Sequence, residues 1–364
     1  MLVYVDDILC MSHAPKRVMD AISKRFKFKK NKVQPPEMYL GARLEEKELN
    51  GRRVWTMSSK EYVKASVENV EERIKDRRYK LNAKAVTPMK SGYIPETDDS
   101  PKLGPDDITL FQECIGMLRW AVEIGRVDVL TEVSMLSSYQ ASPREGHLEQ
   151  VIHIFAYLKK KPKLTLYFNP ELPRVDPSMF SGDKSEDFLE QYRDAEEEMP
   201  PRMPKSRGRG LVIMAFVDAS HAANKVTRRS HTGFIIFLNR APIIWYSKRQ
   251  NTVEASTFSS EFIAMKACME SVVAMRYKLR MFGVPVDTPA DVLCDNQSVV
   301  NNSSKISSVL NKKYCSIAYH AVRWSVAADI LRVGKVDTEH NLADAMTKRL
   351  TAEKRNHLFG NWTY

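Results

Sequence analysis

The chain has 364 residues and carries 56 Lys and Arg against 45 Asp and Glu, a formal net charge of +11 at pH 7. This length fits two or three domains, and a hydrophobic content of 43% is typical of globular domains. No uncharged apolar run reaches about 18 residues, which excludes a membrane-spanning protein.

The charge is unevenly distributed along the chain. Residues 1–90 carry +9, residues 91–210 carry −6, and residues 211–364 carry +8. Two basic blocks around an acidic middle favour a polyanionic partner such as nucleic acid. The five cysteines form no Cys-x-x-Cys pair and no signal peptide is evident, so we expect reduced thiols in an intracellular compartment and no zinc site.

The first ten residues place two adjacent acids, Asp6 and Asp7, between two apolar runs. This pattern predicts a hairpin with both carboxylates at its tip. Polymerases that use two metal ions need such a group aimed at the incoming nucleotide. The pattern alone is weak, because many turns contain the same dipeptide.

A second hairpin and three helices are predicted next. Asn50-Gly51 is a dipeptide favoured in hairpin turns, and it separates the strand-like residues 38–44 and 53–57. Ser58-Ser59 is expected to cap a helix over residues 60–76. Further helical patterns cover residues 110–120 and 145–160, after a connection at 82–107 that is rich in Pro, Gly, Ser and Asp.

Residues 171–210 have few apolar side chains and segregated charge. Seven acids lie between Ser185 and Met199, and a basic stretch follows from Arg202 to Arg209. Such a composition buries little surface, so we expect a flexible charged linker here.

Four acidic residues lie at the ends of predicted strands or on predicted helices in the C-terminal part. Asp218 follows the apolar run 211–217, Glu261 lies in the helical segment 255–282, Asp295 follows the strand-like run 291–294, and Asp344 lies in the predicted helix start 341–348. An α/β sheet can gather all four at one edge. Glu254 is an alternative to Glu261 seven residues earlier.

Such a set suits two-metal phosphodiester chemistry. Two divalent cations about 3.5–4 Å apart hold the attacking and the leaving oxygen. Mg²⁺ prefers oxygen ligands, and the acids would repel one another without a cation. A single Asp is more simply a helix cap or a solvated group, but the whole set in this order favours a metal centre.

The C-terminal part also predicts its own sheet. The strand-like runs 232–239 and 242–247 form an antiparallel meander with 211–217. The helix with Glu261 and strands near Val292 and Leu331 follow, which gives a mixed sheet covered by helices.

Short motifs in this part resemble the ribonuclease H domain of copia-type LTR retrotransposons, and they occur in the family's order. They are Phe216-Val-Asp-Ala-Ser220, Ser230-His-Thr-Gly233, Ala241-Pro-Ile-Ile-Trp245, Ser247-Lys-Arg-Gln250, Ser259-Ser-Glu-Phe262, Cys294-Asp-Asn-Gln-Ser298, Tyr319-His320 and Leu342-Ala-Asp-Ala-Met-Thr-Lys348. Tyr4-Val-Asp-Asp7 likewise resembles the palm motif of a reverse transcriptase.

The resemblance implies an α/β fold: a ribonuclease H-like mixed sheet with flanking helices, preceded by a partial reverse transcriptase palm and thumb and a helical connection. The expected boundaries are 1–57 for the partial palm, 58–100 for a thumb-like helix and connection, 101–170 for a helical connection region, 171–210 for the linker, 211–350 for the ribonuclease H domain, and 351–364 for a C-terminal tail.

The implied reaction is hydrolysis of the RNA strand of RNA–DNA hybrids with two Mg²⁺ or Mn²⁺ ions. By resemblance Asp218, Glu261, Asp295 and Asp344 bind these ions, and Asp6 and Asp7 are remnant polymerase ligands. The family has fingers and a further palm Asp before this motif. We therefore expect no DNA synthesis from this chain alone, which dNTP incorporation on a primed RNA template would measure.

Nucleic-acid contacts are expected from basic and small polar residues. Arg228, Arg229, Lys248 and Arg249 are predicted to grip the backbone, and Asn296 and Ser298 to read 2′-hydroxyls. His340 is a weaker candidate for moving protons, and His320 is expected to be structural. Other retroelement polyprotein products are further expected partners, in a cytoplasmic virus-like particle or the nucleus.

Two alternatives stay open from the sequence. One is a degenerate retroelement product that binds nucleic acid without cutting it. The other is a strand-transferring integrase of the same fold, although its three acids have a different spacing.

Overall fold

The computed structural model describes residues 2–4, 7–28, 33–180, 184–307 and 315–360. At the N-terminus, β1 (Leu2–Tyr4) and β2 (Asp7–Leu9) pair antiparallel, with Tyr4 opposite Asp7, and α1 (Pro15–Ser23) follows. Asp6 and the side chain of Asp7 lie outside the described residues, so their place at the hairpin tip stays a prediction.

An antiparallel sheet of four strands comes next, in the order β3-β4-β5-β6. Its strands are β3 (Met38–Tyr39), β4 (Ala42–Leu49), β5 (Arg52–Ser58) and β6 (Thr165–Tyr167). The predicted hairpin turn is confirmed: Asn50 and Gly51 have φ of 52° and 75°, and a tight hairpin turn of this kind needs positive φ at both positions.

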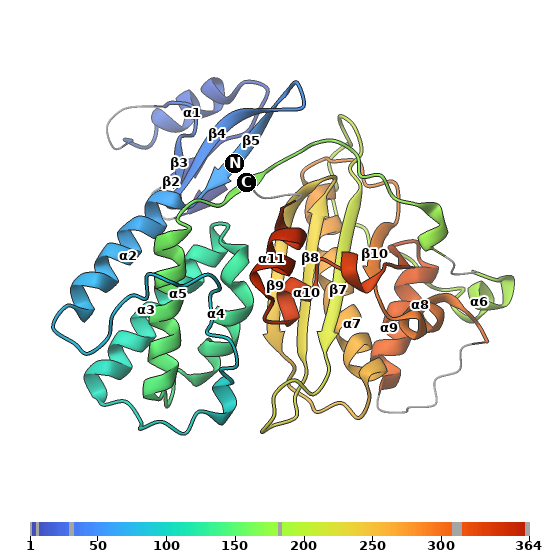
Figure 1. Cartoon of the computed structure of the whole chain (residues 1–364). Helices are drawn as coiled ribbons and strands as arrows, with labels where there is room; N and C mark the ends of the chain where they lie inside the picture. The colour runs from blue at the N-terminus through green and yellow to red at the C-terminus, as the bar shows by residue number, and fades with distance from the viewer. Residues whose placement is uncertain (1, 5–6, 29–32, 181–183, 308–314, 361–364) are drawn as a thin grey trace.

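Four helices form a helical body beside this sheet (Figure 1). They are α2 (Lys60–Ile74), α3 (Pro105–Glu123), α4 (Leu130–Leu136) and α5 (Glu145–Lys160), with 3₁₀ turns at Pro95–Thr97, Val127–Val129 and Ser137–Tyr139. The three predicted helices are thus confirmed. The predicted side-chain cap is wrong, because Ser59 is the N-cap residue of α2 but makes no capping hydrogen bond.

The C-terminal sheet has the order β11-β10-β7-β8-β9. Its strands are β7 (Ile213–Ser220), β8 (His231–Leu238), β9 (Ala241–Arg249), β10 (Ala290–Cys294) and β11 (Leu331–Lys335). The predicted meander β7-β8-β9 is antiparallel, and β10 pairs parallel with both β7 and β11. The predicted mixed sheet is confirmed.

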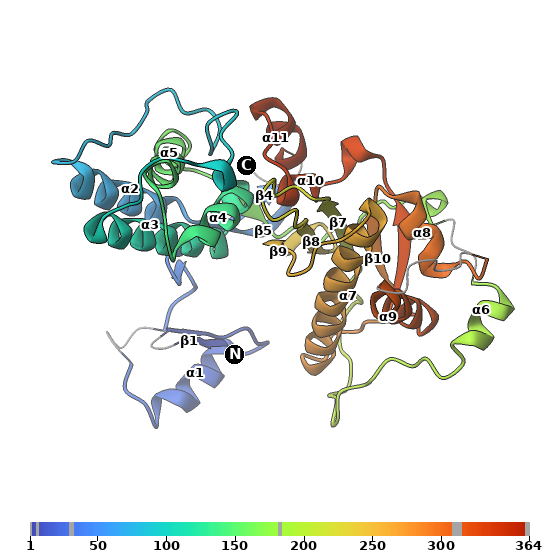
Figure 2. The ribbon, with the colours of Figure 1, turned by 90° about the horizontal axis from the view of Figure 1, so that it is seen from below.

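Helices cover both faces of this sheet because successive strand residues point to opposite sides. Ala215 and Val217 share a buried cluster with Phe262 of α7 (Thr257–Met281), together with residues of α8 (Gln297–Ser304) and α9 (Ser316–Ala327). On the other face lie α4, α10 (Asp344–Thr347) and α11 (Ala352–Phe359), after a 3₁₀ turn at Thr338–His340. Figure 2 shows α11 beside α4, between the helical body and the sheet.

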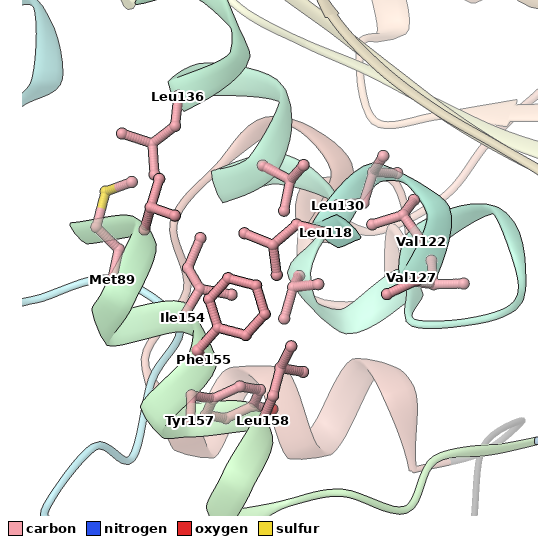
Figure 3. Packing of buried hydrophobic residues seen from close by; sticks show 14 of the residues in the cluster. Met89, Leu118, Val122, Val127, Leu130, Leu136, Ile154, Phe155, Tyr157 and Leu158 are labelled. Atoms are coloured by element: carbon pink, nitrogen blue, oxygen red, sulfur yellow. The ribbon is translucent and has the colours of Figure 1, made fainter. Parts of the chain in front are cut away.

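One hydrophobic core joins the helical body to the C-terminal sheet. Leu118, Val122 and Phe155 lie at its centre in the helical body (Figure 3), and Phe216 and Met346 belong to the same cluster from the sheet side. Polar contacts cross the same boundary. They are Trp245 Nε1 to the Val122 carbonyl (3.1 Å), Thr131 Oγ1 to the Ala345 carbonyl (2.7 Å) and Ser134 Oγ to the Ser247 carbonyl (2.7 Å).

The flexible linker predicted for 171–210 is wrong for much of its length. A 3₁₀ turn (Pro177–Met179) and α6 (Glu186–Gln191) form here, Phe180 lies under the Arg332 guanidinium, and Phe188 is fully buried. Glu197 forms ion pairs with Arg276 and Arg280 of α7. The average composition of the segment does not indicate that Phe180, Phe188 and Glu197 are ordered, because each contacts a partner far away in the chain.

The predicted C-terminal tail also needs correction. Residues 352–359 form α11, and its Leu358 and Phe359 are buried in the core that joins the two halves. Over the described ranges, no helix combines the length and the apolar character that crossing a membrane requires.

Replacing Glu197 by glutamine is expected to loosen the segment that precedes β7. Burial acts to raise the pKa of Glu197, but Arg276 and Arg280 hold it at about 2, so the carboxylate is charged and its loss leaves two buried guanidinium groups unpaired. We expect a loss of roughly 3 kcal/mol in the free energy of unfolding, measured by urea denaturation, and faster limited proteolysis between 198 and 210. Glu196→Gln is the matched control because Glu196 is exposed; equal proteolysis of both variants would contradict the prediction.

Candidate metal centre

Three of the predicted acids meet at one edge of the C-terminal sheet. Asp218 lies near the end of β7, and Asp295 directly follows β10. These strands run parallel, with Leu293 opposite Phe216, so their carboxyl ends share an edge. Glu261 reaches the same edge from the first turns of α7, where its Oε2 accepts a hydrogen bond from the Ala219 amide (3.1 Å). One carboxylate oxygen from each acid lies within 4.8 Å of the other two.

Asp344 lies beside this group but outside the three-acid cluster. It begins α10, and both of its oxygens contact lysines: Oδ1 contacts Lys348 Nζ (2.5 Å) and Oδ2 contacts Lys354 Nζ (2.9 Å). Lys348 Nζ is also 3.3 Å from Asp218 Oδ2. The fourth predicted acid is therefore linked to the cluster through a lysine.

The three-acid cluster is electrostatically crowded. Burial, with the charges of Asp218 and Asp295, raises the pKa of Glu261 to about 9. Burial also raises the pKa of Asp218, although Lys348 and the Thr347 hydroxyl oppose this shift. The crowded carboxylate oxygens of the buried Asp218 and Glu261 and of the half-buried Asp295 are hard donors, a set that fits Mg²⁺ or Mn²⁺.

Thr347 and Lys348 were part of a family motif in the sequence but had no assigned role. Thr347 Oγ1 donates a hydrogen bond to Asp218 Oδ2, and Lys348 bridges Asp218 and Asp344. The four-residue spacing from Asp344 to Lys348 was the available signal, because residues four apart are neighbours on a helix.

Gly233 allows α10 to lie directly on β8. A Cβ atom at this position would lie 2.6 Å from Met346 Cβ, 2.6 Å from Thr347 Cγ2 and 2.8 Å from the Met346 carbonyl carbon. Backbone and Cβ atoms cannot give way as a flexible side-chain end can. The glycine of the Ser-His-Thr-Gly motif thus sets the position of Thr347 and of the Asp344 and Lys348 side chains.

Gly233→Ala is expected to push α10 away from the sheet. The extra methyl overpacks the contact, and we expect a loss of about 1–3 kcal/mol in the free energy of unfolding. Binding of Mn²⁺ at the three-acid cluster should weaken together with stability, because Thr347 then no longer fixes Asp218. Thermal unfolding and calorimetric titration with Mn²⁺ measure the two effects. Gly92→Ala is a control, since a Cβ there meets nothing within 4 Å although its φ of 77° adds local strain; equal losses of Mn²⁺ binding would contradict the role of Gly233.

Other predicted candidates lie elsewhere. Glu254 Oε1 accepts a hydrogen bond from Thr252 Oγ1 (2.7 Å), and Glu254 is not part of the three-acid cluster. His340 is exposed, with its ring 6.2 Å from that of His357. His320 Nδ1 is 2.8 Å from the Tyr192 hydroxyl, in keeping with its expected structural role.

The predicted nucleic-acid contacts divide into groups. Arg229 and Arg249 line a cavity of about 250 Å³ together with Lys348, Arg349 and Ser220. Lys248 lines a neighbouring cavity of about 450 Å³ that also contains Arg229 and Arg249. Arg228 is exposed and lines neither cavity.

Asn296 and Ser298 begin α8 on the other side of Asp295. The Asn296 side chain caps the helix by accepting hydrogen bonds from the amides of Ser298 (3.0 Å) and Val299 (3.4 Å), and Ser298 is exposed. The contacts of all these residues with nucleic acid stay predictions.

Comparison with known proteins gives consistent relatives over nearly the whole chain. The chain is 24% identical over 365 aligned positions to the retrovirus-related Pol polyprotein from transposon TNT 1-94 of Nicotiana tabacum, covering 97% of this chain and 23% of that protein. It is 26% identical to the Pol polyprotein from transposon RE1 of Arabidopsis thaliana, covering 96% and 20%. The chain therefore spans about a fifth of the length of these relatives.

A shorter relative is a putative transposon Ty5-1 protein of Saccharomyces cerevisiae, 26% identical over 74% of this chain and 72% of that protein. No known protein-family profile matches the chain.

Among solved structures, an RNase H1 isolated from compost is similar to 37% of this chain and 92% of its own, with 16% identity and a TM-score of 0.31. The N-terminal RNase H domain of a Mycobacterium tuberculosis protein matches 42% of this chain and 99% of its own, with 14% identity and a TM-score of 0.29. The sequence relatives confirm what the motifs predicted: the chain is similar along nearly its whole length to Pol polyproteins of copia-type LTR retrotransposons.

Proposed function

We propose that the chain is the C-terminal part of a retrotransposon reverse transcriptase joined to a ribonuclease H that hydrolyses the RNA strand of RNA–DNA hybrids. The observation that carries this proposal is the cluster of Asp218, Glu261 and Asp295, with carboxylate oxygens within 4.8 Å of one another. A group of buried acids without compensating cations costs stability, which a divalent ion offsets.

Two of the acids are oriented by neighbouring groups of the chain. Asp218, Glu261 and Asp295 would hold Mg²⁺ or Mn²⁺, and Asp344 with Asp218 would flank a second ion. Bound there, the cations supply positive charge beside the attacking water and the leaving oxygen. The Ala219 amide orients Glu261, and the Thr347 hydroxyl orients Asp218. The chain itself thus fixes the donors before a cation arrives.

The substrate would lie along the basic cavities next to this edge. Arg229, Arg249 and Arg349 offer guanidinium groups for backbone phosphates. Asn296 and Ser298, at the start of α8 beside Asp295, offer polar groups for the 2′-hydroxyls that distinguish RNA from DNA.

Parallel assays with a labelled RNA–DNA hybrid, duplex DNA and duplex RNA test the proposal. We expect Mg²⁺-dependent cleavage of the RNA strand of the hybrid alone, and complete loss of cleavage with EDTA. Binding of the hybrid without cleavage would support the degenerate, non-catalytic product instead. Joining of DNA ends would support an integrase.

For the N-terminal part we propose a segment of a reverse transcriptase palm. The Tyr4-Val-Asp-Asp7 resemblance and the confirmed hairpin at Asn50-Gly51 support it. Incorporation of dNTPs on a primed RNA template measures the predicted lack of DNA synthesis. An intracellular location, in a virus-like particle or the nucleus, and association with other polyprotein products are part of the same proposal.

A further inference from the structure

The positive charge near the four acids is distributed unequally. Asp344 contacts two lysines, Lys348 and Lys354, and Asp218 contacts Lys348. In the parts of the chain that the structure describes, no ion pair reaches the side chains of Glu261 or Asp295. Asp344 and Asp218 are therefore compensated by lysine, whereas Glu261 and Asp295 are not.

Lys348 lies between Asp344 and the three-acid cluster. Its Nζ is 2.5 Å from Asp344 Oδ1 and 3.3 Å from Asp218 Oδ2, so one ammonium bridges two acids from different elements. A second divalent ion held by Asp218 and Asp344 would need the same space and the same oxygens. The close contact of α10 with Gly233 fixes the backbone that carries this lysine.

Charge balance limits how many cations the site accepts. With a divalent ion bound, the four carboxylates are ionised and carry −4, and Lys348 with Lys354 brings +2, so this one ion neutralises the site. A second divalent ion would leave an excess of +2 in a mostly buried environment, which is unfavourable unless an anion enters with it. The phosphodiester of a nucleic-acid strand is such an anion.

We propose that Lys348 is a positioning residue whose ammonium occupies the second cation position in the substrate-free protein and yields it when the hybrid binds. This rests on the proposed nuclease function. The Lys348 side chain is 38% exposed and lines the same cavity as Arg229 and Arg249. It can therefore exchange its acidic partners for a phosphate oxygen by changing rotamer, which makes complete metal loading depend on substrate.

Titrating Mn²⁺ into the initially metal-free protein and counting the bound ions tests the role of Lys348 directly. Calorimetry and electron paramagnetic resonance should find one tightly bound ion in the wild-type chain without nucleic acid. In Lys348→Met a second ion should bind at least about tenfold more tightly than in the wild type, because its position is vacated. Addition of a hybrid with a 2′-O-methyl RNA strand, which resists cleavage, should bring the wild type to two ions.

Matched variants separate position from charge. Lys348→Arg keeps a cation between Asp218 and Asp344 and should bind one ion. Lys354→Met removes a positive charge from Asp344 but leaves Lys348 in place, and should also bind one ion. Circular dichroism verifies the fold of each variant, and Lys348→Gln replaces Lys348→Met if the latter unfolds.

Two results would overturn the proposal: two tight ions in the wild type without nucleic acid, or one ion in a folded Lys348→Met or Lys348→Gln variant. Failure of the nuclease function would appear differently. In that case the hybrid would stay uncut although the ion counts follow the expected pattern.

Discussion

Asp218→Asn is expected to lower hybrid cleavage by at least about 100-fold and, at the same time, to raise the melting temperature of the metal-free protein. The loss of activity follows because Asp218 contributes to the proposed ion site and is held there by Thr347. The gain in stability follows because the pKa of Asp218 is raised by burial, so the fold disfavours its charged form and tolerates a neutral amide better.

The same variant should change how stability depends on pH. Glu261 titrates near 4.5 in the unfolded chain and at about 9 in the fold, so the folded state binds the extra proton between these values. The free energy of unfolding of the metal-free wild type should therefore fall as pH rises through this interval. In Asp218→Asn the fall should be smaller, because one of the charges that raise the pKa of Glu261 is removed.

Thermal unfolding with EDTA and with Mg²⁺, over the same pH interval, measures these effects beside the cleavage assay. Glu254→Gln is the matched control: it removes a largely buried acid seven residues from Glu261 that contacts Thr252 instead of the cluster. It should retain cleavage. Wild-type cleavage by Asp218→Asn, or equal damage from both variants, would contradict the assignment.

Arg355→Met is expected to destabilise the whole chain by about 3–5 kcal/mol. Arg355, on α11, pairs with Glu132 of α4 at 2.6 Å and donates to the Asp128 carbonyl, and both side chains of the pair are almost completely buried. Removing the guanidinium leaves a carboxylate buried without its partner. Since α4 and α11 belong to the core that joins the two halves, denaturant unfolding should show the loss in probes from both halves.

A double variant separates charge from packing. Glu132 Oε2 and Arg355 Nε have no hydrogen-bond partner among the described residues, so the pair is incompletely satisfied. Glu132→Leu combined with Arg355→Met should therefore recover most of the stability, as buried ion pairs replaced by apolar groups often do. A double variant no more stable than Arg355→Met alone, or a loss under about 1 kcal/mol in the single variant, would contradict the prediction.

Local patterns were sufficient for most elements of the fold. The turn at Asn50-Gly51, the helix over 145–160 and the strands around Asp218 and Asp295 follow from dipeptide preference and hydrophobic period, which act over a few residues. The linker failed as a prediction because Phe188 and Glu197 are stabilised by α7 and α9, more than 70 residues away in the chain. Composition averaged over a segment does not register such distant partners.

The sequence by itself predicted the mixed sheet and indicated which acids could gather at its edge, since the strands and helices that carry these acids follow from local hydrophobic pattern. Only the tertiary structure decided how those acids are divided. Asp218, Glu261 and Asp295 converge because β7 and β10 pair in parallel, and Lys348 reaches Asp218 because α10 lies against Gly233. The contact between Asp344 and Lys348 follows from their four-residue spacing on a helix, but Asp295 and Lys348 lie 77 and 130 residues after Asp218, and spacing along the chain does not encode these long-range contacts.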